Sequence, residues 1–195
     1  MKEKIILLLA SPNRDGNSAS LGKKFLSQIN TDKFEVEEVY LYDWNLNYCS
    51  NDNFNFGPEK KKLEPEAEDL FSKIQESKYI VITSPIWNFG VPAAFKNFLD
   101  RSSNFGRKWS EEKGEKISNW KDKKFYLFFT TGAPKFALVL NFIAIMQVVL
   151  SIKYFGAKKK IVKVMGNCGN GKKNLVSDRE KDLKKIMKKG KKIFS

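Results

Sequence analysis

The sequence predicts an α/β protein in which a doubly wound, five-stranded parallel sheet is covered by helices on both faces. Apolar runs of strand length alternate with amphipathic helical patterns from one end of the chain to the other. Within the strand-like runs, such as Ile5–Leu9 and Tyr79–Ile82, consecutive residues are apolar, which indicates burial on both faces. A length of 195 residues is typical of one domain, so we expect residues 1–195 to form a single unit.

The expected strands are rich in apolar, β-branched and aromatic residues, and they are Lys4–Ala10, Glu35–Leu41, Tyr79–Thr83, Lys124–Thr130 and Lys160–Met165. The expected helices have apolar residues at helical spacing, and they are Ser18–Ile29, Pro65–Glu76, Pro92–Ser103, Lys135–Lys153 and Ser177–Ile193. Pro92 suits a first helical turn, because an N–H there has no partner within the helix. Two segments, Asp43–Glu64 and Gly106–Asp122, interrupt the alternation, and we expect functional loops near the ligand end of the sheet.

The first apolar segment, Ile5–Ala10, follows Lys2 and Lys4 as the apolar part of a signal peptide would. It is six residues long, which is too short, and no small-residue cleavage site follows it. We interpret it as a buried strand. Cys49 and Cys168 match neither metal-binding nor thioredoxin-like spacing, and a chain without a secretory signal is expected in a reducing cytoplasm.

The longest apolar segment, Phe136–Leu150, is shorter than a membrane span and contains Asn141 and Gln147. A helix that is hydrophobic nearly all round is expected in a protein core or against another subunit. The segment is therefore consistent with a homodimer, although a helix buried within one subunit would have the same pattern.

The formal net charge of +14 comes largely from lysines in the last third of the chain, many of them on the polar side of the final amphipathic helix. One interpretation is a solvated surface. The other is attraction of polyanions or of a phosphate-bearing cosubstrate. Nucleic-acid binding would favour arginines interleaved with exposed aromatic residues, and the chain has few arginines.

Three loops follow expected strands and are expected at one edge of the sheet. The first, residues 11–20, contains Gly16 in a tight turn and Ser18 and Ser20 at a helix start, which is a natural seat for a phosphate. It contains neither a Walker motif nor a Gly-x-Gly-x-x-Gly fingerprint. An ordinary helix cap would have the same residues.

The second loop, after Thr83, contains one planar apolar ring in Trp87 and one amide in Asn88. The third, Thr130–Pro134, has small residues that let backbone N–H groups approach a ligand. Each loop also has an ordinary interpretation: the second could be a strand-to-helix connection with a buried Trp, and the third could be a plain turn. Together, the three loops fit a mononucleotide with a flat ring, bound without a metal.

The chain contains no histidine, which excludes most catalytic triads, most zinc sites and histidine-based acid–base schemes. The chemistry then comes from a cofactor, with the protein supplying orientation and electrostatics. No side chain is assigned as a catalytic acid, base or nucleophile.

The segments Ser84–Phe89 and Val91–Arg101 resemble the flavin-ring loop and following helix of the flavodoxin-like NAD(P)H-dependent oxidoreductases, which include FMN reductases, quinone reductases and azoreductases. The resemblance covers about the first two thirds of the chain. It implies a flavodoxin-like fold, FMN as cofactor, and NADH or NADPH as cosubstrate. It also implies a homodimer with the active site at the interface.

By the same resemblance, the first loop would hold the FMN phosphate, and the second and third would border the flavin ring. The phosphate residues would be Ser11, Asn17, Ser18, Ala19 and Ser20. The ring residues would be Pro85, Ile86, Trp87, Asn88 and Phe89, with Thr131, Gly132 and Ala133 at the pyrimidine end. Ala133-Pro134 stands where many relatives have a second glycine, and Cys49 stands where some relatives have clustered cysteines, so no iron–sulfur cluster is expected.

The leading hypothesis is an FMN-dependent NAD(P)H oxidoreductase. It would pass hydride through flavin N5 to a quinone, azo, nitro or flavin acceptor by a ping-pong mechanism. A second hypothesis is a flavodoxin-type electron carrier or regulatory flavoprotein without efficient NAD(P)H turnover. A third is a module that binds nucleic acid or an acidic partner, which would bind in a steeply salt-dependent way and retain no flavin.

Overall fold

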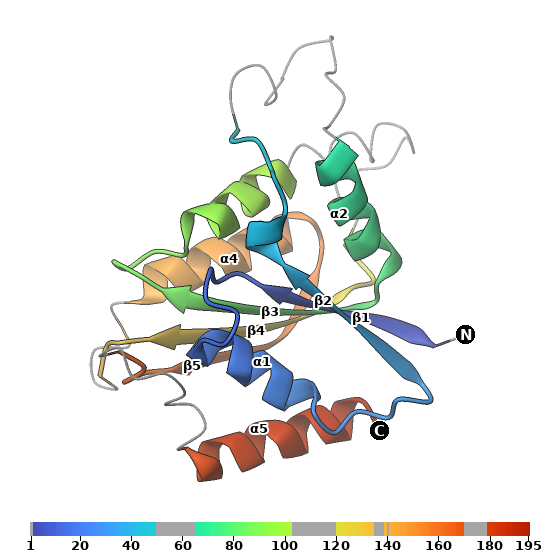
Figure 1. The fold of residues 1–195 in the computed structure, drawn as a ribbon, viewed down its shortest axis with the longest axis vertical. Coiled ribbons are helices and arrows are strands. Elements are labelled where there is room, and N and C mark those ends of the chain that lie inside the picture. Colours follow the sequence, from blue (N-terminus) through green and yellow to red (C-terminus); the bar gives the residue numbers. More distant parts are fainter. Residues whose placement is uncertain (1, 50–64, 103–119, 135–138, 140, 170–178) are drawn as a thin grey trace.

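Five parallel strands form one sheet in the computed structural model, which describes residues 2–49, 65–102, 120–134, 139, 141–169 and 179–195. The strands are β1 (Glu3–Leu9), β2 (Phe34–Tyr40), β3 (Tyr79–Ile86), β4 (Lys124–Thr131) and β5 (Lys158–Met165). Their order in the sheet is β2-β1-β3-β4-β5 (Figure 1). The chain adds β2 on one side of β1 and β3 on the other, so the order reverses at β1. Ligands of such sheets bind outside the carboxyl ends of the strands at this reversal.

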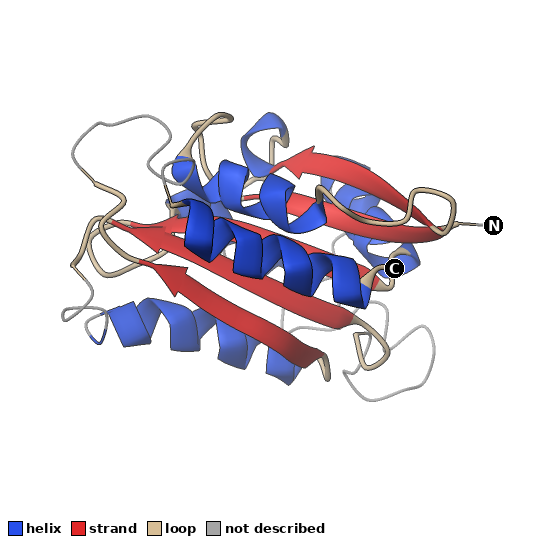
Figure 2. Cartoon of the chain, turned by 90° about the horizontal axis from the view of Figure 1, so that it is seen from below, coloured by secondary structure: helices blue, strands red, loops and turns tan. Residues whose placement is uncertain are grey.

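Helices cover both faces of the sheet, which confirms the expected fold class (Figures 1 and 2). The helices α1 (Asn17–Leu26) and α5 (Glu180–Ile193) lie on one face. The other face carries α2 (Pro65–Glu76), a helix over residues 93–102, and α4 (Phe142–Tyr154). Residues of β1 alternate between the two cores, with Ile6 and Leu8 in one and Ile5 and Leu7 in the other. This double burial explains the consecutive apolar residues of the strands.

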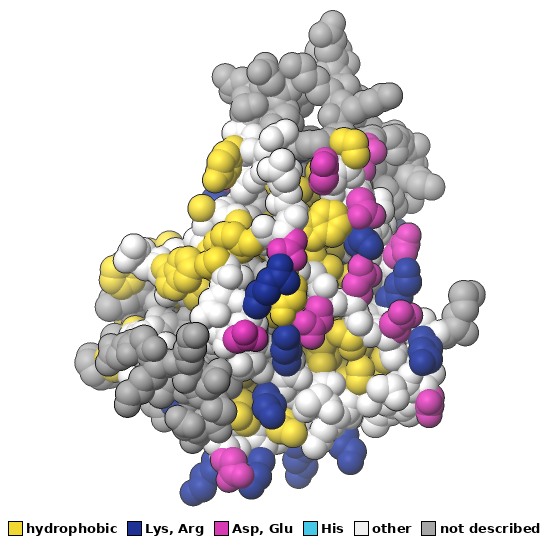
Figure 3. Space-filling view, in the orientation of Figure 1, with side chains coloured by type: hydrophobic (Ala, Val, Ile, Leu, Met, Phe, Trp, Pro, Cys, Tyr) yellow, Lys and Arg dark blue, Asp and Glu magenta, His cyan; other side chains and the backbone are white. Residues whose placement is uncertain are grey.

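The last helix, α5, packs its apolar side against α1 and leaves its lysines exposed. At Gly190 the two helices touch so closely that a Cβ would lie 1.9 Å from the backbone oxygen of Phe25. Beyond α5, the ring of Phe194 contacts those of Phe25 and Tyr79 at centroid distances of 5.8 and 5.2 Å. Figure 3 shows the lysines along the edge of the molecule where α5 lies.

The expected end of the third strand at Thr83 was wrong, because β3 continues through Pro85 to Ile86. Beyond Thr83 the strand still pairs with β4, up to the pair Ile86 and Thr131. The backbone oxygen of Thr83 accepts a hydrogen bond from the Ala10 N–H, so Thr83 faces β1, and Pro85 faces the same side two residues later. Because β1 has ended there, the proline leaves no hydrogen bond of the sheet unmade.

Other boundaries moved by a few residues. The first helix ends at Leu26 rather than Ile29, where the N–H and the hydroxyl of Ser27 both donate to the Lys24 carbonyl, at 3.3 and 2.9 Å. The fifth strand begins at Lys158 rather than Lys160, and the fourth ends at Thr131. Residues 50–64, 103–119, 135–138, 140 and 170–178, which include most of both predicted loops and the starts of the last two predicted helices, lie outside the described residues.

The apolar helix α4 is buried on one side only within this chain. Its buried residues are Ala144, Val148, Val149 and Ile152. Its exposed apolar residues are Phe142, Ile143, Leu150 and Tyr154. In the part of the chain that the structure describes, no helix is long and apolar enough to cross a membrane.

Candidate functional site

The parallel sheet brings the three predicted loops to the same edge, beyond the carboxyl ends of β1, β3 and β4. Hydrogen bonds fix their relative positions. The first loop begins beside β3, where the Ala10 N–H donates to the Thr83 carbonyl at 2.9 Å. The turn after β4 is joined to the segment after β5, where the Cys168 N–H donates to the Thr131 carbonyl at 2.8 Å.

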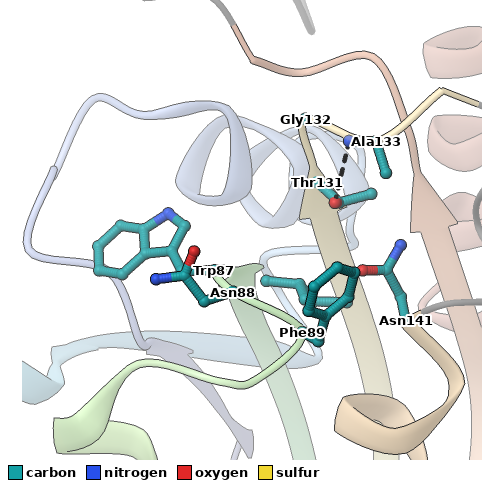
Figure 4. A pocket seen from close by; sticks show the side chains of 8 residues that line it. Trp87, Asn88, Phe89, Thr131, Gly132, Ala133 and Asn141 are labelled. Atoms are coloured by element: carbon teal, nitrogen blue, oxygen red, sulfur yellow. Dashed lines mark hydrogen bonds between the residues drawn. The ribbon is translucent and has the colours of Figure 1, made fainter.

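A pocket of about 520 Å³ lies between the second and third loops (Figure 4). It is lined by Ile86, Trp87, Asn88, Phe89, Thr131, Gly132, Ala133 and Asn141. Trp87 is 49% exposed and Phe89 is 59% exposed, so these rings are not part of the core. The alternative of a plain connection with a buried Trp does not describe this loop. Pro85 and the predicted phosphate residues do not line this pocket.

The second loop is a two-residue turn held by paired backbone hydrogen bonds. Trp87 and Gly90 each donate an N–H to the other's carbonyl at 2.9 Å. The two central residues, Asn88 and Phe89, both have positive φ angles, of 48° and 62°. Asparagine tolerates this conformation well, whereas for a bulky residue such as phenylalanine it is strained. Such strain is concentrated at binding and catalytic sites, and here it presents an aromatic ring at the mouth of a pocket.

The third loop is braced from two directions. Within it, the Ala133 N–H donates to the Thr131 hydroxyl at 3.2 Å (Figure 4). From the segment after β5, the Asn167 N–H donates to the Ala133 carbonyl at 2.8 Å. Gly132 lies against Gly169, and a Cβ added to Gly169 would lie 3.0 Å from the Cα of Gly132. The segment 166–169 therefore fixes the shape of this loop, a role that sequence reasoning missed.

The first loop wraps the start of α1. The Gly16 N–H donates to the Asn13 carbonyl, and the Asn13 N–H donates to the Ser11 hydroxyl, each at 3.2 Å. Gly16 is the N-cap residue and supplies no capping side chain, and the first turn of the helix contains no acidic residue. Ser11 and Ser18 are buried. The start of α1 thus offers backbone N–H groups and a positive dipole end, with no nearby carboxylate on the helix itself.

Two further contacts hold this loop in place. The side-chain amide of Asn17 donates to the Cys168 carbonyl at 3.4 Å, which connects α1 to the segment after β5. Arg14 forms an ion pair with Asp43, and its guanidinium lies 4.2 Å from the centre of the Tyr40 ring. The start of α1 and the third loop are therefore both tied to the same segment, 166–169.

Neither cysteine is activated as a nucleophile. Burial raises the pKa of the Cys49 thiol and that of the Cys168 thiol, so both are protonated at neutral pH. The Sγ of Cys168 donates weakly to the carbonyls of Met165 and Gly166, at 3.4 and 3.5 Å. Among the described residues, no group of cysteines and carboxylates is arranged to hold a metal ion.

Asn141 is the pocket residue that the sequence did not suggest. It precedes α4 within the apolar segment Phe136–Leu150, where a single polar residue drew attention only as an argument against a membrane span. In the structure it is 2% exposed and its side chain reaches the pocket beside Phe89 (Figure 4). No local sequence signal distinguishes such a residue from a polar residue on the surface of a helix.

Comparison with known proteins supports the same family. A family model described as a flavodoxin-like fold matches residues 3–158. The chain is 27% identical over 141 residues to an FMN-dependent NADH:quinone oxidoreductase of Pseudoalteromonas atlantica, covering 68% of this chain and 70% of that one. It is 25% identical to the protein of the same name from Pelagibacter ubique, covering 94% and 100%. Other curated relatives match over about half of their length.

A solved structure shows the same fold over the whole chain. It is an FMN-dependent NADH-azoreductase from Bacillus anthracis in complex with FMN, with a TM-score of 0.73 and 13% sequence identity. The superposition covers 99% of this chain and 100% of that one. The strand order, the loops at the carboxyl edge and the family match over residues 3–158 lead to one conclusion: this chain belongs to the flavodoxin-like fold family.

Proposed function

We propose that this protein is an FMN-dependent NAD(P)H oxidoreductase of the quinone reductase and azoreductase type, and that the whole chain forms one FMN-binding unit. One observation carries the proposal. The pocket of about 520 Å³ unites the two loops that the sequence assigned to a flat ring, at the edge of the sheet where α1 begins. Relatives whose names state this activity support it over most of the chain's length.

The pocket fits the ring system of FMN in size and in the character of its lining. Its volume lies in the range typical of small-molecule sites, roughly 300–1,000 Å³. Trp87 and Phe89 supply planar apolar surface, and the turn at Thr131–Ala133 supplies the backbone N–H of Gly132. This combination of aromatic surface and close backbone donors suits a flat heteroaromatic ring with polar edges.

The phosphate of FMN would bind at the start of α1, where Ser11, Ser18 and Ser20 offer hydroxyls and the first helical turn offers backbone N–H groups. An anion there is favoured by the helix dipole. The absence of an acidic residue from that first turn avoids repulsion.

When bound, FMN would supply the hydride chemistry, accepting a hydride from NADH or NADPH and giving electrons to a quinone or azo compound. The protein would orient the ring and stabilise its negative charge with the backbone N–H dipole of Gly132. The pocket residues include no titratable side chain, so protons are not supplied by the described lining. Nucleotide and acceptor would occupy the same exposed side of the pocket in turn, which gives ping-pong kinetics.

We also propose that a second copy of the chain covers α4. The exposed apolar residues Phe142, Ile143, Leu150 and Tyr154 lie on one helix that adjoins the pocket at Asn141. An apolar helix side of this kind is an expected protein interface. A second copy there would lie beside the pocket mouth, as the family resemblance implies.

The proposed activity is tested by NADH and NADPH oxidation with menadione and with an azo dye, in the presence and absence of added FMN. We expect FMN-dependent turnover and parallel lines in double-reciprocal plots at several acceptor concentrations. Intersecting lines would contradict the shared site. A lack of turnover with both nucleotides, in a protein that retains flavin, would instead favour the electron-carrier hypothesis.

A further inference from the structure

The Nδ2 of Asn141 is a buried hydrogen-bond donor that has no partner in the structure. The residue is 2% exposed and lines the pocket, and in Figure 4 its side chain lies beside Phe89, with the amide oxygen toward the Phe89 ring and the nitrogen on the other side of the amide. Buried donors in native proteins are nearly always paired, and an exception at a ligand pocket needs a specific explanation.

Asn141 does not serve the helix that it precedes. It is the N-cap residue of α4, but its side chain makes no capping hydrogen bond, and its backbone is helical, with φ −85° and ψ 0°. An effective N-cap residue has an extended backbone and accepts from an N–H two or three residues later. The amide is therefore available for another partner.

Asn97, a second buried asparagine, shows how this protein satisfies a structural amide. It is 7% exposed and its Nδ2 donates to the carbonyls of Leu46 and Asn47, at 3.0 and 3.3 Å. Its Oδ1 accepts from the Cys49 N–H at 3.3 Å. Asn97 thus holds the segment after η1 (Leu41–Asp43) against the helix of residues 93–102. The two residues offer a matched comparison of a paired and an unpaired buried amide.

We propose that Asn141 is a cofactor-binding residue whose amide turns when FMN binds, so that its Nδ2 donates a hydrogen bond to a ring carbonyl oxygen of the flavin. This inference rests on the proposed function. Of the described residues that line the pocket, Asn141 alone brings a side-chain amide from the α4 side, and its Nδ2 lacks an acceptor oxygen. The hydrogen bond strengthens when the ring gains negative charge on reduction, because hydrogen bonds to charged acceptors are about twice as strong.

The test compares Asn141→Leu with Asn97→Leu, since leucine has nearly the shape of asparagine and no polar atoms. FMN affinity is measured by quenching of flavin fluorescence, and folding by thermal unfolding of the protein without FMN. We expect Asn141→Leu to weaken FMN binding about tenfold, equivalent to about 1.4 kcal/mol, with an unchanged or higher Tm. Asn97→Leu is expected to lower Tm and to leave the FMN Kd within about twofold of wild type.

The reduction potential gives a second readout that a structural role would not change. If the reduced ring loses about ten times more affinity than the oxidised ring in Asn141→Leu, the two-electron potential falls by about 30 mV. Asn141→Asp, which replaces the donor with a carboxylate, is expected to lower the potential further.

Each failure has its own meaning. Wild-type protein that retains no FMN would overturn the proposed function, and the inference with it. Wild-type protein that binds FMN while Asn141→Leu binds it equally well would overturn the inference alone. A fall in the Tm of Asn141→Leu as large as that of Asn97→Leu would show a structural amide and overturn the inference.

Discussion

Two Trp→Ala substitutions should affect different properties of the protein. Trp120→Ala should lower stability, and Trp87→Ala should lower FMN affinity. Trp120 is 1% exposed and packs on Phe125 and Phe155 at ring-centroid distances of 5.1 and 4.7 Å. Its indole Nε1 has no hydrogen-bond partner in the structure, so the loss on truncation is one of packing. Removal of a fully buried Trp costs about 3–5 kcal/mol, which lowers the Tm of a chain of this length by about 6–20 °C.

Trp87 is half exposed, and its place in the turn depends on backbone bonds to Gly90 that truncation leaves intact. We therefore expect Trp87→Ala to cost less than about 1.5 kcal/mol in stability. If the indole stacks on the bound ring, FMN affinity falls by about 1–3 kcal/mol, or roughly 5- to 150-fold.

The assays are thermal unfolding without FMN and titration of flavin fluorescence. Trp120→Ala protein, measured below its lower Tm, should bind FMN within about threefold of wild type. If Trp87→Ala destabilises the fold as much as Trp120→Ala, Trp87 belongs to the core. If Trp87→Ala binds FMN as tightly as wild type, the assignment of this loop to the ring is wrong.

Three other predictions concern stability, pH and assembly. Gly190→Ala places a Cβ against the backbone of Phe25, so we expect a loss of about 3 kcal/mol in urea unfolding, whereas Lys189→Ala on the exposed side should change it by less than about 0.5 kcal/mol. Burial raises the pKa of Tyr126 to about 12 in the folded protein, whereas the pKa of a tyrosine in the unfolded chain is near 10. The neutral phenol therefore stabilises the fold fully below about pH 10, and this stability is lost as the pH rises toward 12. By pH 11.5 the loss should reach about 2 kcal/mol, and urea midpoints of Tyr126→Phe should fall less steeply with pH than those of wild type; parallel curves would refute this. Ile143→Asp should convert the proposed dimer to a 22.5 kDa monomer in light scattering. If wild type and Ile143→Asp have the same mass, whether that of a monomer or of a dimer, α4 is not the interface.

The sheet and its loops could be predicted because their signals are local. Strands such as Ile5–Leu9 are apolar at every position, and only strands covered on both faces need this pattern. Alternating strands and helices then place every strand-to-helix loop at the same edge. The Trp87-Asn88 loop was recognised because a large ring beside an amide stood between a buried strand and a helix.

What the sequence did not reveal depends on contacts between distant segments. The third strand was predicted to end at Thr83, before Pro85, but the effect of this proline on strand pairing depends on where β1 ends. The segment 166–169, which follows β5, donates hydrogen bonds to the carbonyls of Thr131 and Ala133 in the third loop. No sequence motif marks this segment. Asn141 is notable because its Nδ2 has no hydrogen-bond partner, and the periodicity of a sequence does not show a missing partner.

The proposed FMN-dependent activity is tested most directly by an absorbance spectrum of the purified protein after FMN addition and desalting, followed by anaerobic titration with NADH and NADPH. We predict that flavin absorbance is retained, is bleached by a stoichiometric amount of at least one nucleotide, and is restored by a quinone. Retained flavin that neither nucleotide reduces would contradict the proposed enzyme activity and point to an electron carrier. Loss of all flavin on desalting would contradict the FMN site itself, and the lysines of α5 would become the surface to test with polyanions.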